Sequence, residues 1–444
     1  MPTTYWSPNQ AAVAQVSTYT YTAPSSVGNT YIATINGKSV TYTSVSGDTA
    51  TTVATAHYNL LSATSSVPAE LTEIQFANPS AGVVTATAKN AGTPFANITI
   101  NGVAGQGLVM STGNGLANGI TTVHTTANKS PSDVADAQNW LRVTPPAAGV
   151  RAIPVNGDDV IVSGSNVPLL WNLDHLIAVQ FNTYTRWQSF VGTIGLPAVN
   201  PVGYDEWRQT YFRFVGPQGS VPSGGLAMVL GYDADGGSGP GRERYNVGSQ
   251  PVTLTILATG SPIDDYAVRF LGVHTANTFK MHAGTSLGIA MTPGETSNLS
   301  SCTVDNSTLG LGAGVTWTAA STLTMYGGSV FINSAPATLL LNNGAFATFG
   351  TTDLTWTTIT AQGGSSMSWP CGGTITTLTM TNSCTLDKSQ DVRTLTITNA
   401  TIDGDTCAFN DPLNAIVWTN PVSVKQQVSS GPFRFTGTRT VRVV

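Results

Sequence analysis

Charged side chains are scarce in this chain of 444 residues. Lysine and arginine together number 18 and aspartate and glutamate 23, which makes 9% charged residues. Ordinary soluble domains carry roughly 25%. No basic patch or stripe interrupts this pattern, so the sequence argues against electrostatic binding of nucleic acid. Because 41% of the residues are hydrophobic and the formal net charge is only -5, the composition is that of a folded chain rather than a disordered one.

Long apolar runs and cysteine are also in short supply. The start, "MPTTYWSPNQAAVAQVSTYTY", has no basic region followed by an apolar core, so we expect no secretory signal peptide. No apolar run is long enough to span a membrane, and we expect a soluble protein made in a cytoplasm. The spacing of the cysteines fits no zinc-binding pattern, and we expect no cofactor and four free, buried thiols. These are Cys302, Cys371, Cys384 and Cys407.

Threonine, serine, glycine, alanine and asparagine take the place of the charges, which favours short strands and tight turns. Residues 1–26 have no periodic pattern and are predicted to be an N-terminal arm that orders only against a partner. Aromatic side chains supply much of the energy in such contacts. The candidate anchoring residues in the arm are Tyr5, Trp6, Tyr19 and Tyr21.

Residues 27–110 are predicted to form a small α+β module. Two alternating runs flank Asn36-Gly37, a strong signal for a hairpin. In "TATTVATAHYNLLSA" the apolar residues recur at helical spacing, and Asp48 is the expected cap. "LTEIQFA", "GVVTATA" and "FANITING" are predicted strands. Residues 111–155 are expected to be a connector and solenoid cap, with a helical turn at "SPSDVADAQNW" capped by Ser132.

A repeat near twenty residues long follows. Each unit has an apolar-x-apolar pair, a small residue, Asn or Gly at a corner, and a second apolar pair, which is the signature of a parallel β-solenoid. We predict a mainly β protein with a right-handed parallel β-solenoid (β-helix) over residues 156–444. The aligned rung residues are Leu254, Phe279, Cys302, Leu323, Leu339, Ile359, Leu378, Leu395 and Ile416.

Two earlier segments are predicted to be the first rungs, Val160 to Val162 and "LIAVQF" (176–181). The end of a solenoid is an exposed sheet edge, which proteins blunt with charge, proline or a covering loop. Asp158, Asp159 and Pro154 are therefore expected to cap that edge.

Several stretches resemble known virion proteins. "ATINGKSVTYTSVSGDTATTVATAHYNLLSA" and "AGTPFANITI" resemble a small module that recurs in bacteriophage virion proteins. The pattern "NW…P…GDDVIV" resembles the entry to β-helical regions of autotransporters and of phage structural proteins. "VGTIGLP", "GYDEWRQTYFRF" and the later repeats resemble β-helical proteins of phages and prophages, over roughly residues 135–420. The resemblance implies a virion as the setting and names no activity.

Motifs of the kind that carry chemistry have plainer explanations here. "GTSLG" around Ser286 matches a nucleophile elbow, but no helical pattern follows it. "GGSGPGRER" (236–244) lacks the lysine and helix of a phosphate-binding loop, and we expect a corner loop. The five histidines, His57, His124, His175, His274 and His282, show no metal-ligand spacing.

Aspartates and tryptophans on the later rungs are the remaining candidates. Paired carboxylates cleave glycans in β-helical tailspikes, but aspartate is also an ordinary turn residue. The aspartates in question are Asp387, Asp391, Asp403 and Asp405. Four tryptophans occupy different offsets from their rung residues, so we expect core or cap positions rather than one sugar platform. They are Trp317, Trp356, Trp369 and Trp418.

The sequence thus favours a non-enzymatic bacteriophage virion protein, assembled in the host cytoplasm, that acts as a capsid decoration or cement protein or as a head fibre. The expected partners are other virion proteins, the major capsid protein above all, and further copies in a homotrimer, because a charge-poor lateral face suits self-association. No nucleic acid and no membrane are expected. The alternative is a tail spike or fibre that binds or cleaves host-surface glycan. A bacterial surface adhesin is disfavoured by the missing signal peptide.

Overall fold

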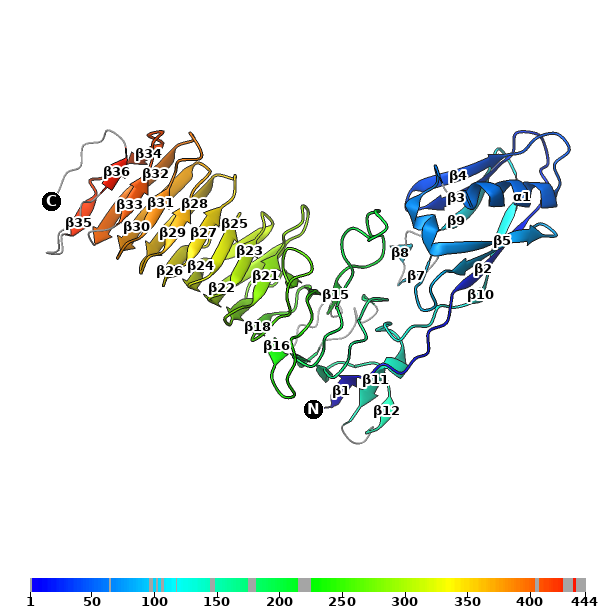
Figure 1. Ribbon diagram of the computed structural model, residues 1–444, viewed down its shortest axis with the longest axis horizontal. Coiled ribbons are helices and arrows are strands. Elements are labelled where there is room, and N and C mark those ends of the chain that lie inside the picture. Colours follow the sequence, from blue (N-terminus) through cyan, green and yellow to red (C-terminus); the bar gives the residue numbers. More distant parts are fainter. Residues whose placement is uncertain are drawn as a thin grey trace.

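Two arrays of stacked parallel strands form a long β-solenoid, and a smaller β-rich module joins it at an angle to make a V (Figure 1). The computed structural model describes residues 2–63, 65–95, 99–100, 103–104, 108–116, 118–143, 148–174, 181–214, 225–403, 407–425 and 434–436.

The first array is a 16-stranded sheet. Its neighbours, in spatial order, are β12 (Val150–Arg151), β11 (Trp140–Arg142), β1 (Thr3–Trp6), β13 (Asp159–Val162), β14 (Thr183–Trp187), β16 (Leu226–Tyr232), β18 (Val252–Ile256), β20 (Thr278–Met281), β22 (Ser297–Asp305), β24 (Val315–Tyr326), β26 (Thr338–Asn342), β28 (Leu354–Ala361), β30 (Gly373–Thr381), β32 (Leu395–Asp403) and β34 (Ile416–Trp418), with β35 (Ser423–Lys425) also on β32. Pairing is parallel from β1 onward, as a solenoid requires.

The second array is an 11-stranded sheet, and from β14 to β34 the chain alternates between the two arrays. Its strands are β15 (Phe212–Arg213), β17 (Glu243–Asn246), β19 (Val268–Leu271), β21 (Ser286–Ile289), β23 (Thr308–Leu311), β25 (Ser329–Ile332), β27 (Phe346–Phe349), β29 (Ser366–Ser368), β31 (Thr385–Asp387), β33 (Ala408–Asn410) and β36 (Arg434–Thr436). No single turn can bury its own apolar side chains, and stacking buries them in one continuous core between the arrays.

Corners of the solenoid carry asparagine or glycine in the left-handed region of backbone conformation. At five successive corners that follow strands of the first array, φ lies between 39° and 75°. A side chain with a branched Cβ is strained there, whereas asparagine and glycine tolerate it. The residues are Asn306, Gly327, Asn343, Gly363 and Asn382. The corner residues predicted from the repeat are confirmed.

Rung alignment from the sequence is confirmed for seven of the nine aligned residues and wrong for the last two. Leu254 pairs in register with Phe279, and the column continues without a break to Leu378. The residue that stacks on Leu378 is Ala400, while Leu395 stacks on Gly373 and Ile416. Strand β32 has nine residues with two apolar pairs, and the sequence pattern alone selected the first pair instead of the second.

The N-terminal strand closes the first rung of the solenoid. Strand β1 pairs in parallel with β13 and antiparallel with β11, and Trp6 is buried against Trp140 with ring centroids 4.9 Å apart. The prediction of an arm over residues 1–26 is therefore wrong. Within β1 the residues alternate between partly buried and buried positions, but no local pattern reveals its partner strands more than 130 residues away.

Asp158 and Asp159 hold this junction together instead of facing outward. Asp158 is fully buried, accepts a hydrogen bond from the Thr4 hydroxyl at 3.0 Å, and forms an ion pair with Arg142. Asp159 accepts hydrogen bonds from the next rung, from Thr183 at 2.7 Å among others. Strands β1, β11 and β12 cover the edge, so the expectation that the aspartates blunt it by charge is wrong. Of the segment "LIAVQF", residues 176–180 lie outside the described part of the chain.

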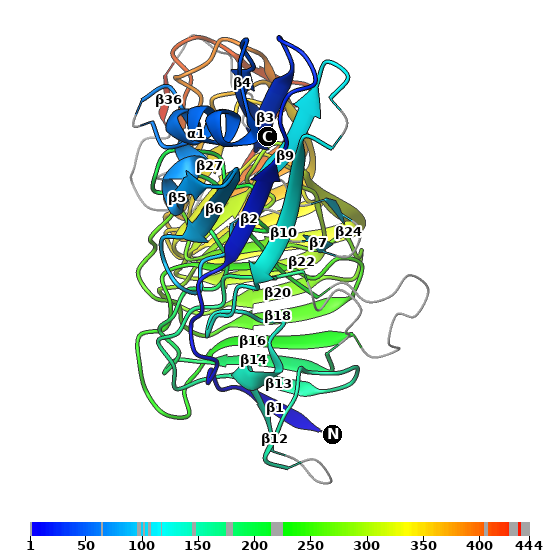
Figure 2. The ribbon, with the colours of Figure 1, turned by 90° about the vertical axis from the view of Figure 1, so that its right-hand side faces the viewer.

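The N-terminal module has two main sheets, a short two-stranded pair and one α-helix (Figure 2). One sheet has the order β10 (Ile120–Thr126), β2 (Val16–Tyr21), β6 (Val83–Ala88) and β5 (Ile74–Ser80), and the other has β4 (Lys38–Thr43), β3 (Thr30–Ile35) and β9 (Val109–Gly113). A separate pair, β7 (Thr99–Ile100) with β8 (Val103–Ala104), completes the strands. The module spans residues 16–126, so the predicted range of 27–110 is too narrow. The predicted connector, 111–155, begins too early. Most of "FANITING" lies outside the described residues.

Local predictions inside the module are largely confirmed. Asn36 and Gly37 turn the β3–β4 hairpin with φ of 49° and 75°. The helix α1 (Ala50–Leu61) forms as expected, but its cap is Thr49, whose hydroxyl accepts from the Thr52 amide. Asp48 lies one residue earlier and accepts from Thr52 and the Val45 amide, among others.

Short 3-10 turns replace two of the predicted features. The first part of "LTEIQFA" is the turn η1 (Ala69–Glu73) rather than a strand. In "SPSDVADAQNW" the turn is η2 (Ala137–Asn139), and its cap is Asp136 instead of Ser132.

Asn139 fastens the two chain segments that connect the module to the solenoid. Its side-chain oxygen accepts hydrogen bonds from the amides of Asn9 and Gln10, and its amide group donates to the carbonyls of Ser130 and Asp133. Because the side chain is fully buried, removing it would leave several buried backbone groups without hydrogen-bond partners.

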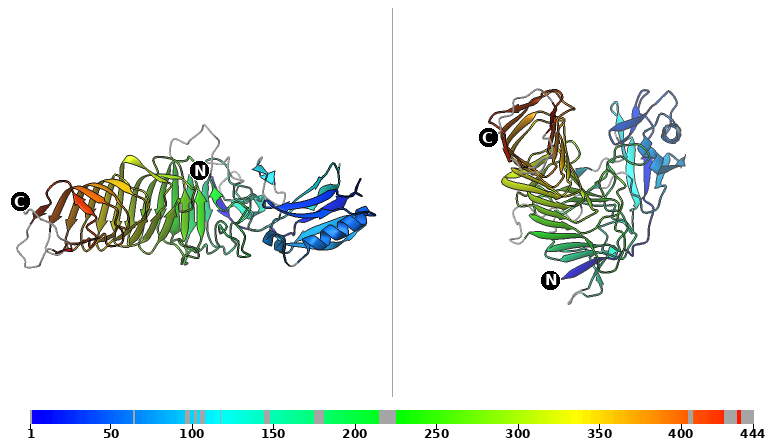
Figure 3. Two further views of the ribbon diagram at one scale, coloured as in Figure 1. Left: turned by 90° about the horizontal axis from the view of Figure 1, so that it is seen from above. Right: turned by 60° about the vertical axis from the view of Figure 1, so that its left-hand side comes forward.

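Figure 3 shows the two branches of the V from two further sides. A second contact bridges the module and the solenoid. Arg208 donates to Glu73 at 2.9 Å and to the Pro94 carbonyl at 3.1 Å, and both acceptors belong to the module. Glu206 and Tyr204 hold the same guanidinium from the solenoid side at 2.8 Å each. Such a multiply bonded arginine fixes geometry better than a single surface ion pair would.

Candidate functional site

Threonine lines the outer surface of the first array in two regular rows. The rows belong to strands β22, β24, β26, β28, β30 and β32 and lie in register from rung to rung. We call this surface the threonine face. One row is Ser301, Thr322, Thr338, Thr358, Thr377 and Asn399, and the other is Thr303, Thr324, Leu340, Thr360, Thr379 and Thr401.

The threonine face follows from the alternation of each strand. Within each Thr-x-Thr unit the middle residue is buried in the core, as Leu323, Ile359 and Leu378 are, and the flanking residues are partly exposed. Nine of the twelve outward positions are threonine, and none carries a charge. The sequence reasoning noted the threonine content but missed this face, although the recurrence of Thr-x-Thr at the rung period was visible.

Geometry makes the face a fixed grid. Neighbouring rungs lie about 4.8 Å apart, and alternate residues along a strand lie roughly 6.6 Å apart. Threonine is stiff at χ1 because its Cβ is branched, so its hydroxyl and methyl groups keep their positions. Both neighbours of each inner strand are hydrogen-bonded, which holds the backbone as well. The face thus presents a preorganised, uncharged lattice of hydroxyl and methyl groups.

A buried ionic network lies inside the first turns of the solenoid. Arg186 points inward between Val162 and Leu230. The other described rungs have an apolar residue at this position. It donates to both carboxylate oxygens of Glu243, at 2.6 and 3.2 Å, and the Tyr245 hydroxyl donates to Glu243 at 2.6 Å. The pair has no exposed atom through which a ligand could approach, so its role is structural.

Two arginines on the outer surface of the second array are paired with neighbouring carboxylates. Arg244 pairs with Asp264 at 2.8 Å and lies over the ring of Tyr211. Arg269 pairs with Asp265 and lies over Tyr266 in the same way. Arg244 and Arg269 are thus engaged by neighbouring carboxylates and rings, so these two side chains offer no open anion site.

The predicted motifs have structural positions. Ser286 is buried in strand β21, not at a strand-to-helix turn, and its hydroxyl accepts from the Ala267 amide. In the loop 236–244, Gly239 lies directly over Arg186, where an added Cβ would come within 2.8 Å of the guanidinium. The loop ends in Glu243, so it closes a corner above the ionic network.

The aspartates of the later rungs are held by their neighbours. Asp387 accepts hydrogen bonds from the Ser389 amide and the Asn410 side chain, both at 3.0 Å. Asp391 is bound by Arg393 at 2.7 to 3.1 Å, and these hydrogen bonds hold the pKa of Asp391 far below its ordinary value. Asp403 ends strand β32, and Asp405 lies outside the described residues. The described carboxylates therefore occupy corner positions.

Aromatic residues divide into core and surface. Trp356 and Trp369 are fully buried, and Trp317 and Trp418 pack partly buried against the core. Of the four candidate anchors, three are buried inside this chain and cannot contact a partner in this fold. These are Trp6, Tyr19 and Tyr21.

Tyr5 lies on the outer side of the first rung, in a short aromatic row. Its ring centroid is 6.4 Å from that of Trp187, and Trp187 is 5.9 Å from Tyr232. A further exposed aromatic residue on the first array is Tyr326, which ends strand β24 two residues beyond Thr324.

The four cysteines are free and buried, as predicted, and burial raises the pKa of the Cys302 thiol to about 12. His57 is buried in the module, His175 lies outside the described residues, and the side chain of His124 is not described. Among the residues that are described, no three His, Cys, Asp or Glu side chains gather to form a metal site. No helix in the described part of the chain is long and apolar enough to cross a membrane.

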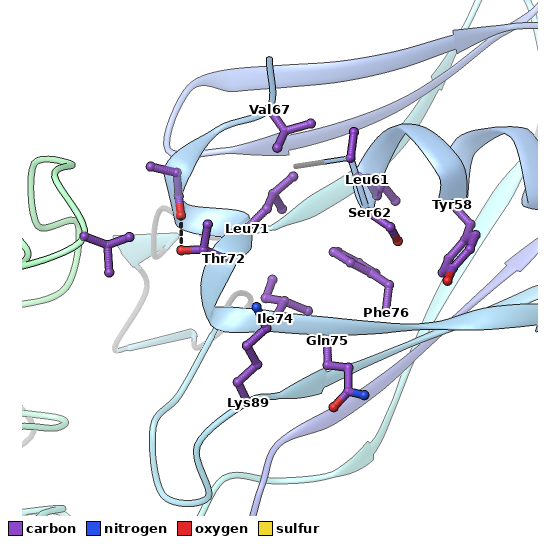
Figure 4. A pocket seen from close by; sticks show the side chains of 13 residues that line it. Tyr58, Leu61, Ser62, Val67, Leu71, Thr72, Ile74, Gln75, Phe76 and Lys89 are labelled. Carbon is purple, nitrogen blue, oxygen red and sulfur yellow. Dashed lines mark hydrogen bonds between the residues drawn. The ribbon is translucent and has the colours of Figure 1, made fainter. Parts of the chain in front are cut away.

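An open hollow of about 560 Å³ lies beside α1 in the module (Figure 4). Its floor is apolar and includes Leu71, Ile74 and Phe76, and Lys89 is its single ionisable amine. Its other polar lining residues are Tyr58, Ser62, Thr72 and Gln75.

Comparisons with protein families, with curated proteins and with solved structures found no match to this chain.

Proposed function

We propose that this chain is a non-enzymatic structural protein of a bacteriophage particle, a capsid decoration or cement protein or a head fibre. The observation that carries the proposal is the elongated solenoid, in which many of the described ionisable groups hold turns, rungs and the module in place. A rod of this kind suits display or clamping on a particle surface. The major capsid protein and further copies of the chain, arranged as a homotrimer, are the proposed partners.

Attachment is proposed to involve the module rather than a free N-terminal arm. The module lies at the far end of one branch of the V, away from the C-terminal rungs (Figure 1). Removing residues 1–26 would delete β1 and β2 and damage both bodies, so that deletion is no clean test of attachment.

The proposal is tested by the copy number of the protein in purified particles, measured by quantitative mass spectrometry. A copy number on the scale of the capsid subunits is expected. A number on the scale of tail components would move the protein to the tail, and absence from the particle would refute the proposal.

A second candidate is a tail spike or fibre that binds or cleaves host-surface glycan. The aromatic row of Tyr5, Trp187 and Tyr232 favours it, because sugar rings stack on exposed aromatic faces. Binding of host capsule or lipopolysaccharide that is lost in Trp187→Ala would support this candidate. Release of reducing sugar by the wild type, abolished in the double variant Asp387→Asn and Asp405→Asn, would make the protein an enzyme.

A further inference from the structure

The threonine face lacks the features by which proteins recognise most ligands. Binding energy at protein interfaces is concentrated in Trp, Tyr and Arg, and the twelve outward positions contain none of them. Phosphate and nucleic acid need lysine or arginine, which the two rows also lack. Sugars stack on aromatic rings, but the aromatic row lies on earlier rungs, and Tyr326 lies at the edge of the face, beyond the second row. A ligand for this face must therefore be recognised by the regular repeat itself.

Ice has such a repeat. Its surface presents oxygen atoms in a regular two-dimensional lattice, and the rungs and alternate residues of the threonine face define a regular grid of about 4.8 by 6.6 Å. Hydroxyl groups can take the place of water in that lattice, and methyl groups can fit between water molecules. We propose that the threonine face binds ice. This inference goes beyond the proposed function and does not rest on it.

Preorganisation explains why threonine suits this role. Ordering a water molecule and ordering a flexible side chain both cost free energy on binding. In the grid the side chains are already fixed by branching at Cβ and by the strands on either side. Each contact is weak, but six rungs act together on one rigid surface.

Cooperation between rungs makes the centre of the face sensitive. A tyrosine at Thr360 would stand above the plane and keep neighbouring rungs from the ice surface. Tyrosine retains strand propensity, so the rung is expected to fold. The matched control is Thr348→Tyr, because Thr348 is a partly exposed, outward threonine on the second array, at strand β27.

The gap in the grid at Leu340 allows a test in the opposite direction. Leu340 is partly exposed and lies in register between Thr324 and Thr360. Replacing it by threonine completes the row, and Leu340→Thr is expected to bind ice more strongly than the wild type. This variant keeps the proposal testable if Thr360→Tyr does not fold.

The experiment measures partition of the purified full chain into a slowly grown ice hemisphere, together with thermal hysteresis, against a protein that ice excludes. The wild type and Thr348→Tyr should be enriched in the ice and arrest its growth. Thr360→Tyr should lose most of the enrichment while it keeps its circular dichroism spectrum and melting temperature. Exclusion of the wild type from ice, or equal losses in both tyrosine variants, overturns the proposal.

Sedimentation velocity tests the competing occupant, a second copy of the chain. If the wild type dimerises and Thr360→Tyr is monomeric, the face is a protein interface and the proposal fails. A wild type whose sedimentation is unchanged by Thr360→Tyr, combined with ice enrichment, supports it.

Discussion

His57 should make the module sensitive to mild acid. The ring is buried between α1 and its neighbours, where Nδ1 accepts a hydrogen bond from the Tyr21 hydroxyl at 2.9 Å and Nε2 donates to the Val40 carbonyl at 3.1 Å. These partners fit the neutral ring, and burial lowers the pKa of His57 from 6.5 to about 4. A proton on the folded side chain would displace the Tyr21 hydrogen bond and leave a charge without water.

The sign and size of the effect follow from linkage. Between pH 6.5 and about 4 the unfolded chain binds a proton at this residue and the folded chain does not, so the free energy of unfolding falls as the pH falls through that range. The whole difference corresponds to about 3 kcal/mol, of which about 2 kcal/mol should be lost between pH 7 and pH 5. Asp48 and Glu70, whose pKa values are lowered by hydrogen bonds, lose their contribution only at more acid pH.

Spectroscopy can separate the module from the solenoid. All nine tryptophans lie outside residues 7–139, so tryptophan fluorescence reports the solenoid and its junction. Tyr19, Tyr21 and Tyr31 are buried in the module, and tyrosine circular dichroism in the near ultraviolet will follow its melting. We expect the module transition to fall with pH between 7 and 5 more steeply than the tryptophan transition.

The control is His57→Gln, because glutamine can accept from Tyr21 and donate to Val40 but does not titrate in this range. Its module should have a melting temperature nearly independent of pH from 7 to 5. If the wild type and the variant show the same pH dependence, the reasoning about His57 is wrong.

Three further predictions concern the solenoid and its junction. Leu378→Asp should cost more than ~4 kcal/mol by burying an unpaired charge, whereas Thr379→Asp on the outer side should cost little, and equal melting temperatures would show that the register is wrong. Glu243→Gln leaves the charge of Arg186 uncompensated and should lower the free energy of unfolding, measured in urea, by about 3–5 kcal/mol. Replacing Arg186 and Glu243 together by leucine and methionine should restore most of that stability. Arg208→Ala should widen the range of angles between module and solenoid, measured by small-angle X-ray scattering, without lowering the solenoid melting temperature.

Features encoded within about twenty residues could be predicted from the sequence. The hairpin at Asn36, the helix after Thr49 and the rungs from Leu254 to Leu378 each depend on alternation, turn residues or spacing that a short window contains. The rung register failed at Ala400 because β32 offers two apolar pairs and only the stacked neighbour distinguishes them.

Features that depend on distant pairing could not be predicted. The strand β1 looks like an irregular arm until β13 is placed beside it, and β10 looks like a connector until it pairs with β2. Arg186 was likewise invisible as a buried residue, because its partner Glu243 lies 57 residues away in an unremarkable loop. The threonine face was encoded locally, but only the solenoid geometry turns the recurrence into a surface.

The path of the chain through the junction has a mechanical consequence. The chain leaves the solenoid after Trp6 and returns to it at Trp140. The module is therefore attached to the solenoid through two chain segments instead of one. A domain on a single linker can swivel about it, which is the usual expectation for neighbouring domains. Two connecting segments that are hydrogen-bonded to each other through Asn139 resist twisting of the module about the solenoid. Bending of the module relative to the solenoid is then the easier motion. A force that pulls on the module would act along strands β1 and β13 and would stress all of the hydrogen bonds between them at once, in shear. The end rung would then break as a unit instead of one hydrogen bond at a time.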